Sequence, residues 1–302
     1  MKYDVVIIGA GPAGLSAGIF TVRAGLSTAC FERLVIGGQA SLSYDISNYP
    51  GFNKISGMDL MKKIHDHATE LGVETFYEDV IDLSKGKNNF VITTKKNKYL
   101  AKQVIIASGC IARKLGLENE IKYIGRGISY CASCDGNFYK NKIVAVVGGG
   151  DTAFEYVDYL APLAKKVYLI NRSEKFKAGD YKLNKAKKYK NVEIFTSAKV
   201  TKIFGEDKLE KVSVNISGKE KELLIDGIFI AIGYEPYLDF LDLDVKLDPY
   251  GYIIVDDEMC TSVDKLYACG DVTSKKFRQV VTACSDGAIA GNSCIKGKSN
   301  DK

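Results

Sequence analysis

The sequence predicts an α/β protein that contains two Rossmann-like units. A short strand rich in Val and Ile runs into a glycine-rich loop at Gly9 and again at Gly148, and each loop opens an apolar-periodic helix. Between these loops lies Cys131-Ala132-Ser133-Cys134, whose spacing is typical of redox-active cysteine pairs. Two nucleotide-type loops and a redox pair in one chain indicate an electron relay.

The first loop is Gly9-Ala10-Gly11-Pro12-Ala13-Gly14, and it follows a buried parallel strand predicted over residues 3–8. In this pattern Gly9 makes a tight turn, Gly11 lets the backbone approach a pyrophosphate, and Gly14 lets helix and strand pack closely. The N-terminus of the following helix offers unpaired N–H groups to phosphates.

A carboxylate stands at the position where a dinucleotide site needs one. The next predicted strand, residues 27–31, ends in Glu32, about twenty residues beyond the loop. An acid there accepts hydrogen bonds from ribose hydroxyls and repels a 2′-phosphate. Strand, loop, helix and acid together favour a dinucleotide site over a glycine-rich turn without ligand.

The second loop, Gly148-Gly149-Gly150-Asp151-Thr152-Ala153, repeats the pattern after a strand predicted over residues 142–147. A helix to about residue 163 and a strand over 166–170 follow, and the chain continues with Asn171-Arg172-Ser173-Glu174-Lys175-Phe176-Lys177. The second strand of the first unit ends in the acidic Glu32, whereas that of the second unit ends in Asn171-Arg172. We therefore expect the two units to bind different nucleotides. A Rossmann unit that keeps its shape without a ligand is the alternative.

Zinc binding is the main alternative to a redox role for the C-x-x-C pair. A structural zinc site needs four ligands, whereas the chain has no second such pair and its only histidines are His65 and His67. We therefore expect no metal and a redox role, with the adjacent Asp135 as the proton-transfer group. The remaining cysteines are expected to be small core residues: Cys30, Cys110, Cys260, Cys269, Cys284 and Cys294.

Composition indicates the number of domains, the cellular compartment and the classes of partner to expect. The 302 residues suggest about two domains, and 46% hydrophobic with 26% charged residues is an ordinary globular balance. No long apolar run is present, so we expect no membrane span, and the opening residues are unlike a secretory signal. Sparse cysteines favour the cytoplasm. The net charge of +5 comes with no aromatic-interleaved basic stripe, so we expect no nucleic-acid partner.

These motifs resemble those of the low-molecular-weight, bacterial-type thioredoxin reductases. The likeness runs from about residue 2 to residue 291, and the motifs occur in the family's order. Besides the two loops and Cys131–Asp135, it rests on Gly37-Gly38-Gln39, Asn48-Tyr49-Pro50-Gly51, Ala107-Ser108-Gly109, Ala231-Ile232-Gly233, Cys269-Gly270-Asp271-Val272 and Phe277-Arg278-Gln279.

The resemblance implies a three-layer ββα domain that binds FAD, with a second Rossmann-like domain inserted into it. FAD would lie on residues 1–113 and 244–302, and the inserted domain, residues 114–243, would carry the cysteine pair. The FAD contacts implied are Gly9, Gly11, Pro12, Ala13, Gly14, Glu32, Gly38, Gln39, Asn48, Gly109, Asp271, Arg278 and Gln279. The implied contacts to a pyridine nucleotide are Gly148, Gly150, Asp151, Thr152, Ala153 and Arg172.

The resemblance also implies roles for the redox residues. Cys134 would exchange electrons with the flavin, Cys131 would attack the disulfide of thioredoxin, and Asp135 would act as acid and base. The inserted domain of such flavoproteins rotates between the flavin and the protein substrate. The family further implies a homodimer formed through the FAD domains.

One departure from the family leaves the electron donor open. Members that use NADPH carry H-R-R-x-x-x-R after the second strand of the inserted domain, and here only Arg172 of that clamp is unchanged. NADPH, NADH and reduced ferredoxin are therefore the candidate donors. Two other readings are a small-molecule dithiol oxidase of the same fold and a non-enzymatic nucleotide sensor.

Overall fold

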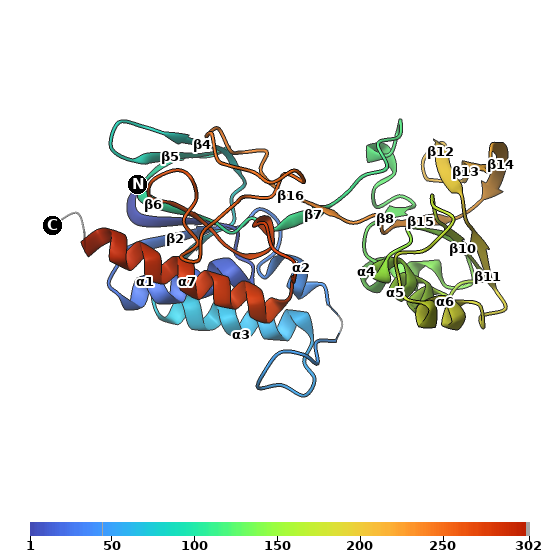
Figure 1. Cartoon of the computed structure of the whole chain (residues 1–302), viewed down its shortest axis with the longest axis horizontal. Coiled ribbons are helices and arrows are strands. Elements are labelled where there is room, and N and C mark those ends of the chain that lie inside the picture. The colour runs from blue at the N-terminus through green and yellow to red at the C-terminus, as the bar shows by residue number, and fades with distance from the viewer. Residues whose placement is uncertain (44, 300–302) are drawn as a thin grey trace. The chain divides into compact units, whose positions relative to one another are not determined.

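The computed structural model describes residues 1–43 and 45–299, and the chain forms two compact units (Figure 1). Residues 1–111 and 235–302 make the discontinuous unit, and residues 112–234 make the inserted unit. The second boundary thus falls earlier than the expected one at 244. The reason is local, because Phe240 is buried in the core of the discontinuous unit and its carbonyl accepts the Leu83 N–H at 2.7 Å.

A parallel sheet of order β3-β2-β1-β6-β17 forms the middle of the discontinuous unit. The first half of β6 also pairs with an antiparallel hairpin, formed by β5 and β4, which extends the sheet in the order β6-β5-β4. The strands are β1 (Lys2–Ile8), β2 (Thr28–Phe31), β3 (Glu74–Phe76), β4 (Val80–Lys85), β5 (Phe90–Thr94), β6 (Lys98–Ile106) and β17 (Leu266–Ala268).

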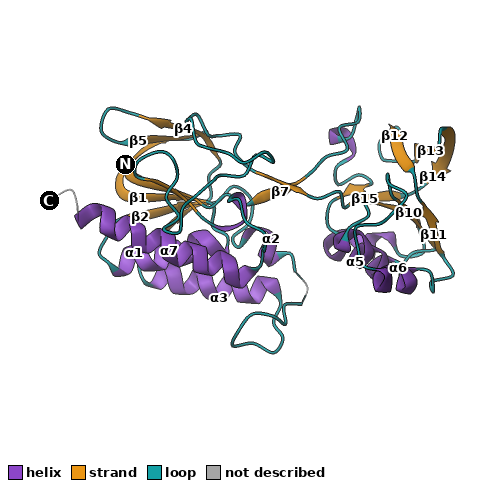
Figure 2. Ribbon diagram, viewed as in Figure 1, coloured by secondary structure: helices purple, strands orange, loops and turns teal. Residues whose placement is uncertain are grey.

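The two faces of β1 belong to two different cores, because successive side chains of a strand point to opposite sides. Val5 and Ile7 pack toward the helices, whereas Val6 and Ile8 pack toward β4 and β5. The helices are α1 (Pro12–Arg23), α2 (Gly38–Ser41), α3 (Gly57–Glu70) and α7 (Val280–Ser299), and Figure 2 shows α1, α3 and α7 along one face of the sheet. The unit is thus a three-layer ββα structure.

The inserted unit repeats this plan. A parallel sheet of order β11-β10-β9-β15-β8 has a three-stranded antiparallel sheet on one side and helices on the other. Its strands are β8 (Ile128–Ser129), β9 (Ile143–Val147), β10 (Lys166–Ile170), β11 (Val192–Phe195), β12 (Ala198–Phe204), β13 (Lys211–Ile216), β14 (Lys219–Leu224) and β15 (Gly227–Ile230). Its helices are α4 (Ala132–Asp135), α5 (Asp151–Leu160) and α6 (Asp180–Ala186).

Short elements complete the description. The strands β7 (Cys110–Ala112) and β16 (Tyr234–Pro236) lie where the chain passes from one unit to the other, and 3₁₀ turns cover residues 121–123, 136–139 and 270–272. Both Rossmann-like units expected from the glycine loops are present, so the predicted fold class is confirmed. Among the described helices, none combines the length and the apolarity needed to cross a lipid bilayer.

Candidate active site and nucleotide-binding loops

The fold requires some glycines of the first loop but not all of them. Gly9 has φ +109°, and a Cβ there would lie 2.3 Å from the Ala107 carbonyl oxygen on the neighbouring strand. A Cβ at Gly14 would lie 1.9 Å from the carbonyl oxygen of Gly9. At Gly11, by contrast, the nearest atom is the Gly37 carbonyl oxygen at 4.0 Å. The protein itself leaves this position open, which fits a ligand that approaches the backbone.

Glu32 is held against the same loop. One carboxylate oxygen accepts the Ala10 N–H at 3.0 Å, the other accepts the Leu34 N–H at 2.9 Å, and the residue is buried. No side chain caps the N-terminus of α1 at Gly11. The loop therefore presents uncapped helix N–H groups next to a fixed carboxylate, as a site for a phosphate and a ribose requires.

Residues expected to contact the cofactor come together from distant segments. The Gln39 side-chain amide donates to the Cys110 carbonyl, and the Cys110 thiol donates to the Asp271 carbonyl at 3.1 Å. The Asn48 amide donates to Gln279 Oε1 at 2.9 Å. These contacts bring four of the expected residues, Gln39, Asn48, Asp271 and Gln279, together from distant segments of the discontinuous unit.

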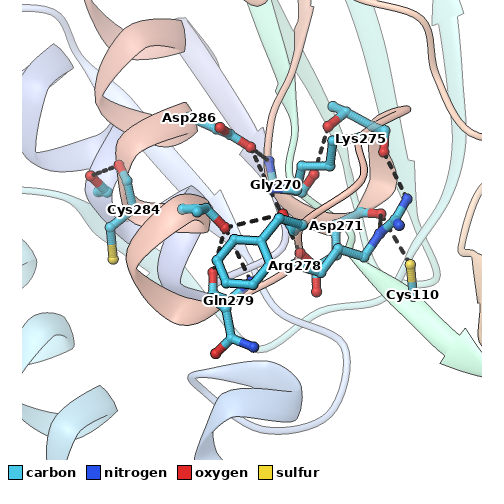
Figure 3. Close-up of polar contacts among 12 residues, drawn as sticks. Cys110, Gly270, Asp271, Lys275, Arg278, Gln279, Cys284 and Asp286 are labelled. Carbon is cyan, nitrogen blue, oxygen red and sulfur yellow. Dashed lines mark hydrogen bonds and ion pairs between the residues drawn. The ribbon is translucent and has the colours of Figure 1, made fainter. Parts of the chain in front are cut away.

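Asp271 carries a buried carboxylate oxygen that accepts no hydrogen bond from the described chain. This oxygen, Oδ1, forms an ion pair with Lys275 Nζ at 3.8 Å, a distance too long for a hydrogen bond. Figure 3 shows Asp271, Lys275 and Arg278 side by side in this region. Burial raises the pKa of the Asp271 carboxyl, and the nearby Lys275 and Arg278 oppose this rise. A buried oxygen without a donor fits a ligand hydroxyl at this point.

A partly buried ion pair supports the same segment, and sequence analysis did not predict it. Lys275 Nζ lies 2.6 Å from Asp286 Oδ2, which also accepts the Gly270 N–H at 3.1 Å. Arg278 donates to the carbonyls of Asp271 and Thr273, at 3.3 Å and 3.1 Å. The one signal for Asp286 is an acid within the otherwise small and apolar stretch of α7.

The cysteine pair lies at the start of α4 in the inserted unit. Cys131 and Cys134 form a disulfide, with their Cα atoms 5.4 Å apart. The Cys131 sulfur accepts the backbone N–H of Cys134 at 3.2 Å, and Cys131 is half-buried whereas Cys134 is exposed. Asp135 Oδ2 accepts a hydrogen bond from the Ser129 hydroxyl at 2.6 Å. Asp135 thus lies on the same short helical turn as the predicted redox pair, where its backbone N–H donates to the Cys131 carbonyl at 3.2 Å, and Ser129 is a residue that sequence reasoning missed.

The second glycine loop has the same division of roles as the first. Gly148 has φ +150°, and a Cβ there would lie 2.2 Å from the Ala231 carbonyl oxygen. A Cβ at Gly149 would lie 2.3 Å from Asn171 Oδ1. Within the described chain, nothing lies within 4 Å of a Cβ at Gly150. This loop too leaves its middle position open to an approaching ligand.

Asn171 has a structural role that the sequence did not reveal. It is buried, and its side-chain amide donates to the carbonyls of Ser173 and Lys175, at 2.8 Å and 3.1 Å. The loop after β10 is therefore fixed by a neutral side chain. Arg172 and Lys177 are exposed on this loop, and neither forms an ion pair with any described residue.

The other cysteines divide into two groups. Cys30, Cys269 and Cys294 are buried, as expected, and burial raises the pKa of each thiol. Cys110, Cys260 and Cys284 are only half-buried, so the expectation of a core position was wrong for these three. Cys260 packs against the edge of the apolar core on the helix side of the sheet, whereas the thiols of Cys110 and Cys284 have polar neighbours, the Asp271 carbonyl and the Tyr49 hydroxyl.

Known proteins share this arrangement along almost the whole chain. The pyridine nucleotide-disulphide oxidoreductase family matches residues 3–287, and the chain belongs to that family. A thioredoxin reductase of Listeria monocytogenes is 41% identical over 298 residues, which cover 97% of this chain and 93% of the relative.

Solved structures point the same way. Thioredoxin reductase of Lactococcus lactis superposes with a TM-score of 0.89 at 38% identity, covering 99% of this chain and all of that one. A ferredoxin-flavin thioredoxin reductase of Clostridium acetobutylicum superposes with a TM-score of 0.55 at 32% identity, covering 100% of this chain and 99% of that one.

Proposed function

We propose that this protein is a flavin-dependent thioredoxin reductase that passes electrons from a reduced donor, through FAD and the Cys131–Cys134 disulfide, to thioredoxin. The observation that carries the proposal is the disulfide itself, followed directly by Asp135. The same chain has two glycine loops whose middle positions, Gly11 and Gly150, leave space for a ligand. Relatives at about 40% identity bear the name thioredoxin reductase.

FAD fits the discontinuous unit. The open Gly11, the fixed Glu32 carboxylate and the unsatisfied Asp271 oxygen match the needs of a pyrophosphate, a ribose and a further hydroxyl. We assign the other contacts to Gly9, Pro12, Ala13, Gly14, Gly38, Gln39, Asn48, Gly109, Arg278 and Gln279. Bound FAD would supply the two electrons that open the disulfide.

The dithiol then carries out thiol–disulfide exchange. The Cys131 thiolate attacks one sulfur of the thioredoxin disulfide, which breaks the thioredoxin S–S bond and forms a mixed disulfide. The Cys134 sulfur next attacks Cys131, which re-forms the enzyme disulfide and releases the second thioredoxin sulfur. Two electrons and two protons move to thioredoxin, and Asp135 is the group that takes up and returns protons. The Cys134 N–H that points at the Cys131 sulfur would stabilise its thiolate.

The relay is tested by replacing one sulfur. Cys134→Ser should abolish thioredoxin reduction while leaving FAD bound, because the second exchange step has lost its nucleophile. Cys260→Ser is the control, since Cys260 is a half-buried cysteine of the discontinuous unit. Undiminished turnover by the Cys134 variant would contradict the relay.

We propose a pyridine nucleotide as the donor. The intact second loop, open at Gly150, supports nucleotide binding through Gly148, Asp151, Thr152 and Ala153, and the exposed Arg172 and Lys177 would meet a phosphate. Reduced ferredoxin is the second candidate. It is favoured by the neutral Asn171 and Ser173, which stand where NADPH-dependent members carry histidine and arginine.

The donor is tested by adding NADPH, NADH and reduced ferredoxin separately to the holoenzyme without oxygen. The donor should bleach the visible flavin band within the turnover time. If neither nucleotide bleaches the band and ferredoxin does, the nucleotide proposal is wrong.

We also propose that the protein works in the cytoplasm as a homodimer formed through its discontinuous units. The six cysteines outside the redox pair are unpaired, which suits a reducing compartment. Light scattering of the purified holoenzyme should give the mass of two chains, and a monomeric mass at micromolar concentration would refute the dimer.

A further inference from the structure

Ser129 occupies a central place in the hydrogen bonding around the disulfide. It is the last residue of β8, and only 4% of its surface is exposed. Its hydroxyl oxygen lies 2.6 Å from Asp135 Oδ2, 3.0 Å from the Cys131 backbone nitrogen and 3.2 Å from the Cys131 carbonyl oxygen. One buried side chain thus touches both the first redox cysteine and the carboxylate beside the second.

The direction of these bonds follows from chemistry. A hydroxyl has one proton to donate, and the charged Asp135 oxygen at 2.6 Å is a better acceptor than the Cys131 carbonyl at 3.2 Å. The Cys131 N–H donates to the same oxygen. The Ser129 hydroxyl therefore accepts a hydrogen bond from the Cys131 N–H and donates one to the Asp135 carboxylate.

The strand gives Ser129 a fixed position. β8 pairs in parallel with β15, where Ser129 lies in register with the buried Phe229. Asp135, by contrast, stands at the end of the four-residue helix α4 and is half-buried. Because Asp135 lies on such a short element, the bond from the sheet is a direct restraint on its orientation.

We propose that Ser129 is a positioning residue that holds the Asp135 carboxylate in place for proton exchange with the Cys131–Cys134 pair. The inference rests on the proposed function, since it takes Asp135 as the proton-transfer group. Ser129 itself touches neither sulfur and acts through Asp135. Its loss should slow the exchange with thioredoxin and leave cofactor binding in the other unit unchanged.

A double-mutant cycle tests whether Ser129 acts through Asp135. The holoenzyme is reduced with one equivalent of dithionite without oxygen and mixed with oxidised thioredoxin from Listeria monocytogenes. Reduced thioredoxin is then trapped by alkylation at successive times. Ser129→Ala should slow the transfer about tenfold, the size expected for one lost hydrogen bond to a charged group. In the Asp135→Ala background, the same change should have no further effect.

Two further variants separate the hydroxyl from the volume of the side chain. Thr and Val have nearly the same shape, so Ser129→Thr should keep most of the rate and Ser129→Val should match the slow alanine variant. This pair still answers the question if Ser129→Ala fails to fold. Ser213→Ala is the matched control, because Ser213 is another buried strand serine of the inserted unit.

The outcomes are distinct. An equal slowing by Ser129→Ala with and without Asp135, or equal rates for the Thr and Val variants, would overturn the positioning role. If the wild-type dithiol fails to reduce thioredoxin at all, the proposed function is wrong instead.

Discussion

Replacing Lys275 should destabilise the protein in a pH-dependent way. Lys275 Nζ lies 2.6 Å from Asp286 Oδ2 and 3.8 Å from Asp271 Oδ1, and the Lys275 and Asp286 side chains are 17% and 15% exposed. Lys275→Met would leave two carboxylates near each other without the cation between them. Breaking a buried pair costs about 3–5 kcal/mol, and an exposed pair is worth at most about 1 kcal/mol. For this partly buried pair we expect a loss of about 2 kcal/mol at neutral pH.

The sign of the pH dependence follows from Asp271. Burial raises the pKa of this carboxyl above its ordinary value, and Lys275 opposes the rise. Without Lys275 the pKa rises further, so the folded variant binds more protons than the unfolded chain in the range just above the ordinary carboxyl pKa. Stability of the variant therefore falls as the pH rises through that range, and the deficit shrinks as the pH is lowered through it.

Thermal unfolding of the holoprotein in excess FAD, followed by circular dichroism between about pH 7.5 and pH 4.5, measures the effect. A loss of about 2 kcal/mol corresponds to a fall in Tm of roughly 4–8 °C. Lys276→Met is the matched control, because this exposed neighbour carries the same charge and forms no ion pair with a described residue. Equal Tm values for the two variants at neutral pH, or a deficit that does not change with pH, would refute the reasoning.

Three other predictions follow from local geometry. Gly149→Ala should lower the Tm, because its Cβ would lie 2.3 Å from the side-chain oxygen of Asn171. Gly150→Ala should fold normally but lose nucleotide affinity in a fluorescence titration. Equal Tm losses for the two variants would contradict this. Glu120→Gln should cost about 2 kcal/mol in chemical denaturation, since the buried carboxylate accepts three backbone N–H groups and a tyrosine hydroxyl; an unchanged midpoint would argue against it. Iodoacetamide at about pH 8 should label the reduced redox pair but not the three buried cysteines, whose raised pKa values keep them protonated; mass spectrometry that finds label on Cys269 in the folded protein would disprove it.

Much of the fold could be predicted from the sequence because its constraints are local. A Val- and Ile-rich strand followed by a glycine loop has few physical solutions, and the close contacts at Gly9 and Gly148 with carbonyl oxygens show why glycine is needed there. The C-x-x-C spacing likewise fixes two sulfurs within one helical turn. The family likeness extended these local patterns to the three-layer architecture.

The rest depends on contacts between residues distant in sequence. The pairing of Asn48 with Gln279 spans 231 positions, and no periodicity reports it. The early end of the inserted unit depends on Phe240 joining the core of the other unit. Ser129 and Asn171 were missed for the same reason, because a lone polar residue at a strand end does not show what its side chain will bind.

The backbone path of the loop after β10 is held by the Asn171 amide and does not depend on the charged side chains of the loop. Because Asn171 binds the backbone carbonyls of Ser173 and Lys175, the side chains of this loop can be exchanged without rebuilding its path. The loop is thus a natural target for protein engineering. Arginine at positions 173 and 177 would recreate the cationic clamp, and a carboxylate at position 172 would disfavour phosphate, so that cofactor choice becomes a design variable on an unaltered scaffold.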